Sequence, residues 1–543
     1  MSAFKRNMHW LMLAIIAVGC QPKSESKKDL TLGEIQFNVT GNEDAQSHFT
    51  KGLLLLHSFE YKDAEEAFVE AQKADPEMLM AYWGEAMTHN HPLWSQQNYE
   101  KGKYALDRLT NEQKEVLKGK VSAVEWELFQ SAEILFGEGE KFDRDQAYSD
   151  HLGKLHDQHP DNHEVSAFYA LSLLGSSNQG RDYELYGKGA KIAKSILNEN
   201  PGHPGALHYL IHAYDDPDHA PLALEAANNY AGVAPDAGHA LHMPSHIYVA
   251  IGMWEEVILS NIASYEARLK KIERKRLNPA SRNYHAYHWL LYGHLQLGHY
   301  EEAKAIMRNM AAYAADTAAK GGLRYYAIEM KGIYLAETGD WDSEFADLTV
   351  NTEDLNIQSQ ASLLFLDGMK AYQQQDKNGM KEAMQQIEDA VSVATGVIES
   401  KGVTVCSGVG FASRLPDQDD LNQAEILLME LKAMYAKLEA DKEGIEKWLK
   451  SAVDLEDKTS YEFGPPNIVF PSYELYGNWL VEEGRAQEAL ALFDKALIKG
   501  PNRISALKGK LAAATHLNDT ALIEALTAKI EGRTPKNELV SSL

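Results

Sequence analysis

The sequence predicts an all-α fold in which helix-turn-helix units stack side by side into a superhelix. Proline is rare, with 17 among 543 residues, and long runs rich in Ala, Leu, Glu and Lys favour helix. Small and aromatic residues recur at matching spacings in two distant segments, Lys51 to Pro76 and Pro471 to Pro501. Between them, Gly252, Gly298 and Gly339 each precede an aromatic residue by two positions, as expected of turns between paired helices.

The chain begins with a pattern typical of an export signal. Lys5 and Arg6 precede an apolar run from Trp10 to Val18, which has about half of the roughly 20 residues that a membrane-spanning helix needs. The residues Ala17-Val18-Gly19-Cys20 resemble the lipobox of bacterial lipoproteins, in which the cysteine is lipidated and becomes the new N-terminus. We therefore expect residues 1–19 to be a signal peptide and Cys20 to carry lipid. An ordinary export signal without lipidation is the alternative.

Residues 20–41 are predicted to tether the lipid to a folded domain. They begin with QPKSESKKD, which is polar and charged and has no apolar periodicity. By the resemblance to lipoproteins, the lack of an acidic residue directly after Cys20 indicates the outer membrane of a bacterial envelope, facing the periplasm. The lipid is then the only predicted membrane contact. The second cysteine, Cys406, has no partner, so no disulfide is expected.

The acidic composition restricts the possible partners. The formal net charge is −26, and removal of a signal containing Lys5 and Arg6 would make the mature chain more acidic still. Such a charge argues against nucleic acid and against an anionic membrane surface. It is compatible with a cationic ligand, although solubility alone would also explain it.

The two repeated segments identify the architecture. The first has Gly52, Ala64, Phe68, Ala71 and Pro76 at the spacings of a 34-residue helix-turn-helix unit. The second repeats the pattern with Gly477, Gly484, Ala489, Phe493, Ala496 and Pro501. Both resemble the tetratricopeptide repeat (TPR), and the resemblance covers most of residues 42–530. It implies a right-handed α-solenoid with a concave inner surface, packing roles for these small and aromatic residues, and a protein or peptide as partner.

The repeats also suggest a division of the chain. We expect an N-terminal TPR-like array over residues 42–320, with a histidine-rich concave face, and a C-terminal array over 321–533. The stretch from Ser505 to Leu526 looks like a final helical pair that caps the stack. Residues 534–543 form a tail.

Histidine is concentrated in the middle of the chain. Nine of the 21 histidines lie between His203 and His288, and HALHMPSH has three in eight residues. In the register of the TPR family, the candidates fall at positions 2, 5 and 9 of three successive repeats, which line the groove. They are His208, His212, His239, His242, His246, His285 and His288. Helical geometry agrees in part, because spacings of three and seven at about 100° per residue keep side chains on one face.

These imidazoles have two interpretations. They could hydrogen-bond a peptide, a glycan or another small molecule, or they could bind Zn²⁺, copper or Ni²⁺, which prefer neutral nitrogen donors. In the second case we expect His242, His246, His208 and His212 as metal ligands, with Asp215 as a carboxylate ligand or base. Asp218 is an alternative carboxylate, and a capping turn at Asp216-Pro217 is the structural explanation of the same loop.

Pro244 bears on the register of HALHMPSH. It sits where a continuous helix would lose the hydrogen bond to the carbonyl of Ala240. If a helix instead begins at Pro244, His239 and His242 are expected in the preceding loop.

The sequence predicts a binding or scaffold protein whose histidine-lined groove holds its ligand. The alternative is a metalloprotein or metal-dependent enzyme that uses the same cluster. A third possibility resembles the nutrient-uptake lipoproteins that carry helical repeats beside a transporter. Catalytic motifs are lacking: His208 and His212 have the spacing of a zinc-protease helix, but Tyr209 stands where the general-base glutamate belongs. We therefore expect no catalytic residue.

Overall fold

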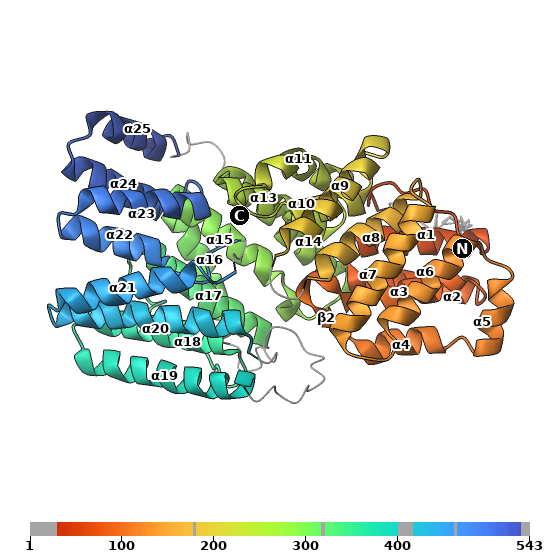
Figure 1. The fold of residues 1–543 in the computed structure, drawn as a ribbon, viewed down its shortest axis with the longest axis horizontal. Helices are drawn as coiled ribbons and strands as arrows, with labels where there is room; N and C mark the ends of the chain where they lie inside the picture. Colours follow the sequence, from red (N-terminus) through yellow and green to blue (C-terminus); the bar gives the residue numbers. More distant parts are fainter. Residues whose placement is uncertain (1–29, 178–180, 316–320, 400–415, 461–463, 534–543) are drawn as a thin grey trace, which may run out of the picture.

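The chain folds into successive helices, most of which pack against their neighbours in the chain (Figure 1). The computed structural model describes residues 30–177, 181–315, 321–399, 416–460 and 464–533. The predicted signal peptide, Cys20, Cys406 and the C-terminal tail lie outside these residues. In the described part, β-structure is confined to one small hairpin, in which Asn90 of β1 pairs with Gln97 of β2. The predicted all-α class is therefore confirmed.

The helices of the N-terminal half are α1 Glu43–His57, α2 Tyr61–Ala74, α3 Leu79–Met87, α4 Tyr99–Asp107, α5 Asn111–Lys118, α6 Ala123–Leu135, α7 Lys141–Gln158, α8 His163–Gly175, α9 Tyr183–Glu199, α10 Pro204–Ala213, α11 Leu224–Val233, α12 Gly238–His242, α13 Pro244–Ile251, α14 Trp254–Lys275, α15 Tyr284–Leu297 and α16 Tyr300–Ala314. Between them lie the strands β1 Asn90–His91 and β2 Gln96–Gln97 and the short 3₁₀ helices η1 Pro92–Trp94, η2 Ala220–Ala223 and η3 Pro279–Ser281. The stack continues with α17 Gly321–Thr338, α18 Ile357–Gln373, α19 Lys377–Glu399, α20 Gln418–Leu438, α21 Lys442–Glu456, α22 Ser472–Glu482, α23 Ala486–Lys499, α24 Ile504–His516 and α25 Thr520–Glu531.

The repeat residues pack as the sequence predicts. The Phe68 ring fills the space between α1 and α3, because a side chain at Gly52 or Gly84 would collide with it, the added Cβ lying 2.8 or 2.4 Å from the ring. Phe493 packs in the same way against Gly477 and Gly509, at 2.8 and 2.3 Å. Each helix pair thus buries its apolar face against the next one, which is how a solenoid is stabilised. The predicted final pair is present as α24 and α25.

The turn glycines end their helices in the left-handed conformation. Gly252, Gly298, Gly339 and Gly484 have φ of 72°, 75°, 66° and 75°, which costs a residue without a Cβ little. After Gly252, the next N–H donates to the carbonyl of Tyr248 at 2.8 Å, the Schellman arrangement. The predicted turns between paired helices are therefore confirmed at Gly252, Gly298 and Gly484. The prediction is wrong at Gly339, because α17 ends at Thr338 but the next helix, α18, begins only at Ile357.

Residues 30–41 correct the predicted tether. They form no helix but lie against the helices, because Leu32, Phe37 and Val39 are buried. Phe37 and Val39 alternate with the exposed residues Gln36, Asn38 and Thr40. The N–H of Glu34 donates to the carbonyl of Gly202 at 2.9 Å. These apolar residues come after the polar stretch QPKSESKKD. Residues 30–41 therefore belong to the folded body and not to a tether.

The C-terminal helices fold back onto the middle of the chain. The carbonyl of Asn502, before α24, accepts a hydrogen bond from Trp254 Nε1 at 3.1 Å. Arg503 is buried between Glu337 and Glu474, with N···O distances of 2.7 and 2.5 Å, and donates to the Tyr292 hydroxyl. These contacts fix the last repeats against α14 and α15, and α15 carries two of the candidate histidines. None of the helices in the described ranges is both long and apolar enough to cross a membrane.

Candidate metal centre

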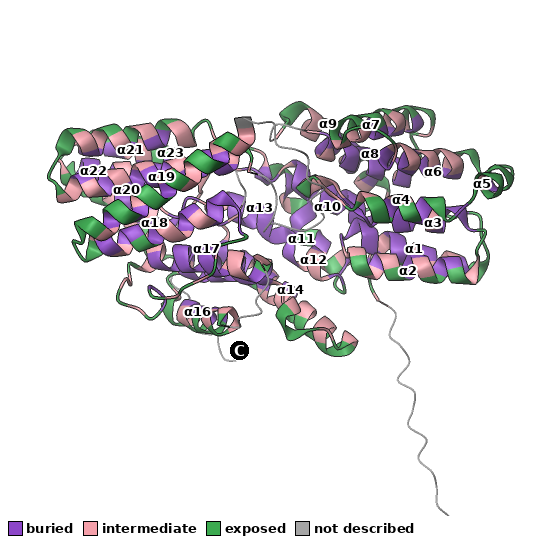
Figure 2. Ribbon diagram, turned by 90° about the horizontal axis from the view of Figure 1, so that it is seen from below, coloured by how far each residue is buried: buried purple, intermediate pink, exposed green. Residues whose placement is uncertain are grey.

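Four short or medium helices in the middle of the chain carry the histidine cluster. They are α10, α12, α13 and α15, and Figure 2 shows α10 and α13 as largely buried. Proline starts two of them: Pro204 is the first residue of α10, after the cap His203, and Pro244 is the first residue of α13. At this position the missing N–H of proline costs no helical hydrogen bond.

The interruption at Pro244 preserves the histidine spacing. A helix does begin at Pro244, but His239 and His242 lie in the short helix α12 and not in a loop. Met243, between the two helices, keeps helical angles, with φ −52° and ψ −37°. The chain therefore follows a nearly continuous helical path, and His239, His242 and His246 stay on one side of it.

The first imidazole set contains His242, His246 and His285. Each offers one ring nitrogen within 4.8 Å of the other two. The His242 and His246 Nε2 atoms are 3.1 Å apart. Two nitrogens at that separation, each about 2.1 Å from a shared ion, would subtend about 95° at the ion, between the octahedral and tetrahedral angles.

Hydrogen bonds at Nδ1 orient the three rings. His246 donates to Asp215 Oδ2 at 2.5 Å, and His242 donates to Asn261 Oδ1 at 2.7 Å. The Asn261 amide cannot turn round freely, because its Nδ2 donates to the carbonyl of Val257 at 2.7 Å. The His285 Nδ1 lies 3.1 Å from the Tyr326 hydroxyl. With Nδ1 protonated, Nε2 carries the lone pair, as in metal-binding histidines whose other ring nitrogen donates to a carboxylate or carbonyl oxygen.

The facing Nε2 atoms favour a cation between them in one tautomer. If His242 and His246 both donate through Nδ1, their Nε2 lone pairs point at each other across 3.1 Å. Two acceptors at that distance repel, unless a metal ion or a proton lies between them. In that tautomer the first set could accommodate either of these two cations.

The second imidazole set contains His208, His212 and His239, again with ring nitrogens within 4.8 Å of one another. His208 donates through Nδ1 to the main-chain carbonyl of His57 at 2.7 Å. The Nε2 atoms of all three are buried and have no hydrogen-bond partner among the described residues. Leaving a buried polar atom unpaired costs about 1–3 kcal/mol, so a ligand that pairs all three would be favoured.

The loop after α10 serves two purposes. Asp216 accepts hydrogen bonds from the main-chain N–H groups of Asp218 and His219, at 3.1 and 3.0 Å, and so caps the predicted turn. Asp215, which is fully buried, instead faces His246, and its Oδ1 has no hydrogen-bond partner in the described chain. Asp218 is exposed. Of the two candidate carboxylates, only Asp215 reaches the cluster.

Two other groups of titratable side chains lie outside the centre. His288 is buried beside Tyr326, with ring centroids 5.9 Å apart, but belongs to neither set.

The carboxylate of Glu164 pairs with His57 and His203 at 2.7 and 3.2 Å. The other ring nitrogens of these two histidines contact the Tyr209 hydroxyl and the Ala206 N–H, so no lone pair remains for a metal. Glu164, His57 and His203 therefore form a structural network, which also positions the carbonyl that holds His208.

Closure of the N-terminal superhelix explains why the cluster is buried. The groove expected from the repeat register would expose these imidazoles, but the first repeat returns to cover them. The Phe59 ring, in the α1–α2 turn, lies 4.2 Å from the His208 ring and 5.7 Å from the His239 ring, between centroids. On the other side, the Trp289 ring lies 4.5 Å from that of His246. Only His239 and His285 remain partly exposed.

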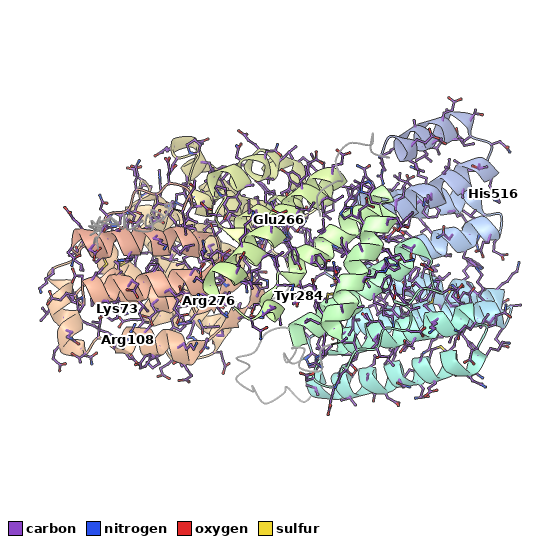
Figure 3. The ribbon with its side chains drawn as sticks, turned by 180° about the vertical axis from the view of Figure 1, so that it is seen from behind. Lys73, Arg108, Glu266, Arg276, Tyr284 and His516 are labelled. Atoms are coloured by element: carbon purple, nitrogen blue, oxygen red, sulfur yellow. The ribbon has the colours of Figure 1, made fainter. Side chains whose placement is uncertain are left out.

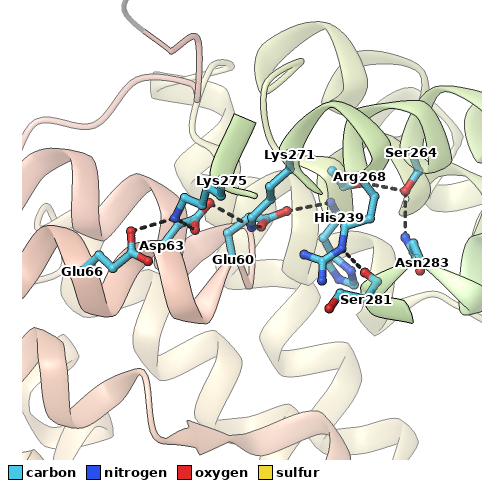
Figure 4. Close-up of polar contacts among 11 residues, drawn as sticks. Glu60, Asp63, Glu66, His239, Ser264, Arg268, Lys271, Lys275, Ser281 and Asn283 are labelled. Carbon is cyan, nitrogen blue, oxygen red and sulfur yellow. Dashed lines mark hydrogen bonds and ion pairs between the residues drawn. The ribbon is translucent and has the colours of Figure 1, made fainter. Parts of the chain in front are cut away.

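Ion pairs hold this closure (Figure 4). Lys271 of α14 contacts Glu60 and Asp63 of the first repeat at 2.6 and 2.8 Å, and Lys275 contacts Asp63 at 2.5 Å. Burial opposes ionisation of Asp63, but the hydrogen bonds and charges of both lysines outweigh it and lower its pKa. The Glu60 carboxylate also accepts from the His239 N–H at 3.2 Å, which links the ion pairs directly to the cluster.

Burial keeps the imidazoles neutral. Desolvation lowers the pKa of His208 and of His242 to about 3, and it lowers the pKa of His212, His239 and His285 well below 6.5. Neighbouring imidazoles lower these pKa values further, because each would repel a second positive ring. Neutral imidazole is the form that binds metal ions.

A cleft leads from the surface to the cluster. It has a volume of about 590 Å³, and its walls include His239, Ser264, Arg268, Lys271 and Asn283. Glu266, labelled in Figure 3, belongs to the same cleft wall. An ion or small molecule could approach His239 by this route.

Several residues of the centre had no signal in the sequence. Asn261, Tyr326 and Trp289 reach the centre only because their helices pack against those that carry the histidines. None of the three belongs to a sequence motif. Asp215 was a candidate because it lies beside the histidines in the chain. The proximity of Phe59 could be recognised only if the superhelix was known to close.

The chain resembles helical-repeat structures only at low identity. No family model and no curated protein sequence matches it. The solved structures that align with it include yeast Tom70, with 11% identity, 90% of this chain and 92% of that chain covered, and a TM-score of 0.30. A P58(IPK) TPR domain aligns with 13% identity, coverages of 88% and 99%, and a TM-score of 0.20. A monomeric mutant of IFIT1 with Gppp-AAAA aligns with 13% identity, coverages of 89% and 89%, and a TM-score of 0.34. The fold assignment rests on the helix pairing in the chain itself.

Proposed function

We propose that this chain is a metal-binding helical-repeat protein, in which His242, His246 and His285 bind one Zn²⁺, copper or Ni²⁺ ion. The observation that carries the proposal is the 3.1 Å separation of the His242 and His246 Nε2 atoms, while both Nδ1 atoms donate elsewhere. Burial and the lowered pKa of His242 and His285 favour the neutral ligand state.

The ligand type narrows the choice of ion. Imidazole nitrogen suits Zn²⁺, copper and Ni²⁺, whereas Mg²⁺ and Ca²⁺ prefer oxygen ligands. Three protein ligands would leave a coordination position open, which is typical of sites that exchange an ion or bind a further ligand. The helical repeats would act as the scaffold that brings three helices together around the ion.

The competing arrangement is a proton in place of the metal. His246 would then be an imidazolium that pairs with Asp215 and donates Nε2–H to His242. Both arrangements use the same hydrogen bonds, so metal content is the decisive measurement.

Elemental analysis tests the proposal directly. The full chain is purified without a histidine tag, dialysed without chelator, and compared with His242→Ala/His246→Ala. His294→Ala is the matched control, because His294 is equally buried on α15 but lies outside both sets. We expect bound ion in the wild type and the control but none at this set in the double variant. No bound ion in the wild type, even after zinc, copper or nickel salts are added back, would overturn the proposal.

We also propose that Cys20 is lipidated and anchors the mature protein to the bacterial envelope, at the periplasmic face of the outer membrane. The lipobox-like residues 17–20 and the polar residues that follow support this. Radioactive palmitate should label the wild type and not Cys20→Ala. Labelling of the variant would contradict the anchor.

A further inference from the structure

We propose that the centre holds two copper ions, one in each imidazole set, as a dinuclear site. This inference rests on the proposed function, because it takes the first set as a metal site and adds His208, His212 and His239 as ligands of a second ion. A single-ion protein would need only the first set.

The second set has the geometry of a separate site. Its three ring nitrogens lie within 4.8 Å of one another, and the three Nε2 atoms are buried without hydrogen-bond partners in the described part of the chain. In the first set, a proton between two rings could satisfy the lone pairs. In the second set, adding a proton to one ring would pair at most two of three nitrogens, whereas a metal ion can bind all three.

The two sets adjoin each other without sharing a ring. The ring centroids of His212 and His246 are 5.5 Å apart, and those of His239 and His242 are 6.2 Å apart. Within a set the separations are similar: 4.9 Å for His208 and His212, and 4.5 Å for His242 and His285. Ions at the two sets would therefore be neighbours in one continuous cluster of six imidazoles.

The side chain of Asp215 connects the two sets. One ring nitrogen each of His212 and His246 lies within 4.8 Å of a carboxylate oxygen of Asp215. Oδ2 accepts from His246, and Oδ1 is buried without a hydrogen-bond partner among the described residues. The carboxylate thus supplies one negative charge close to both sites.

The ligand set favours copper. Six imidazole rings are available, and the Asp215 carboxylate accepts a hydrogen bond from one of them. Among divalent first-row ions, Cu²⁺ binds nitrogen ligands most tightly. Two neighbouring Cu²⁺ ions would also give a magnetic signature that diamagnetic Zn²⁺ cannot give.

The partly exposed member of each set provides a mild test variant. His239 and His285 are the only imidazoles of the two sets that are partly exposed, so their replacement disturbs the core least. His239→Ala should remove one ion and His285→Ala the other. His294→Ala, which removes a buried imidazole outside both sets, should change nothing.

Copper loading of the full chain tests whether two copper ions bind as neighbours. The untagged protein is incubated with copper(II) sulfate alone, desalted, and analysed for copper content, for oxidation state by the X-ray absorption edge, and for electron paramagnetic resonance (EPR) intensity. We expect two Cu²⁺ per chain with an EPR signal well below the copper content, because neighbouring Cu²⁺ ions couple. Each single variant should hold one Cu²⁺ with full EPR intensity.

The outcomes separate this inference from the proposed function. The wild-type chain could bind one copper ion that His239→Ala keeps and His285→Ala loses. That result would overturn the dinuclear site but leave the proposed metal-binding function standing. Two coppers with full EPR intensity would also overturn the pair. No bound copper, zinc or nickel would overturn both proposals. The wild-type stoichiometry and EPR intensity decide the matter even if a variant fails to fold.

Discussion

The carboxylate of Asp215 accepts a hydrogen bond from His246 Nδ1 at 2.5 Å, in an environment where both side chains are buried. The contact joins the loop after α10 to the first turn of α13, 31 residues later in the chain. It fixes the orientation of the His246 ring and leaves Nε2 pointing at His242. A carboxylate in this position also makes the imidazole a stronger donor to a metal ion.

Asp215→Asn should weaken metal binding without unfolding the protein. The amide has the same shape and can still accept from His246, but it lacks the negative charge. We expect metal affinity to fall by about 10- to 100-fold, as is typical when the hydrogen-bond partner of a metal-binding histidine is changed. Competition titration against a chelator measures this. Asp218→Asn, in the same loop but exposed, should bind as the wild type does, and equal affinities for all three proteins would contradict the role of Asp215.

Removal of metal should lower the melting temperature. A ligand that binds only the folded chain stabilises it by about 2.7 kcal/mol at 100 times its dissociation constant. Scanning calorimetry of the copper-loaded and chelator-treated wild type should therefore show a higher transition for the loaded form. In His242→Ala/His246→Ala the metal-dependent shift should shrink or vanish, whereas His294→Ala should keep it. A chelator that leaves the wild-type transition unchanged would argue that the cluster is satisfied without metal.

The metal-free protein should lose stability as the pH falls below about 6.5. Burial lowers the pKa of His208 and His242 to about 3 in the folded chain, whereas unfolding restores their usual value near 6.5. Between these values the unfolded chain binds more protons, so acid favours unfolding, by about 1.4 kcal/mol per pH unit for each imidazole that stays neutral. Urea unfolding at pH 7.5, 6.5 and 5.5 measures this. His208→Gln should flatten the dependence. A midpoint independent of pH over this range would show that the imidazoles are not held neutral.

The fold could be predicted from the sequence because repeat packing depends on local patterns. The small and aromatic residues around Phe68 and Phe493 set the helix pairing, and the turn glycines marked helix ends. The centre could be predicted only in part. The periodicity of His239, His242 and His246 placed them on one side of the chain, but periodicity does not tell whether a concave surface stays open. Phe59 and Trp289 cover the cluster through contacts between distant segments, and these depend on the curvature of the whole stack.

Weakening the closure should expose the second set more than the first. Lys271 and Lys275 hold the first repeat against α14 through partly buried ion pairs with Glu60 and Asp63, and breaking such pairs costs more than breaking exposed ones. We expect Lys271→Met/Lys275→Met to accelerate hydrogen exchange in α12 and around Phe59, and to weaken the ion bound by His208, His212 and His239. Hydrogen exchange followed by mass spectrometry measures the opening. Lys270→Met, which removes an exposed pair with Glu266, should exchange like the wild type. If the double variant leaves exchange in α12 unchanged, the ion pairs do not keep the groove closed, and packing of Phe59 alone must hold the first repeat over the histidines.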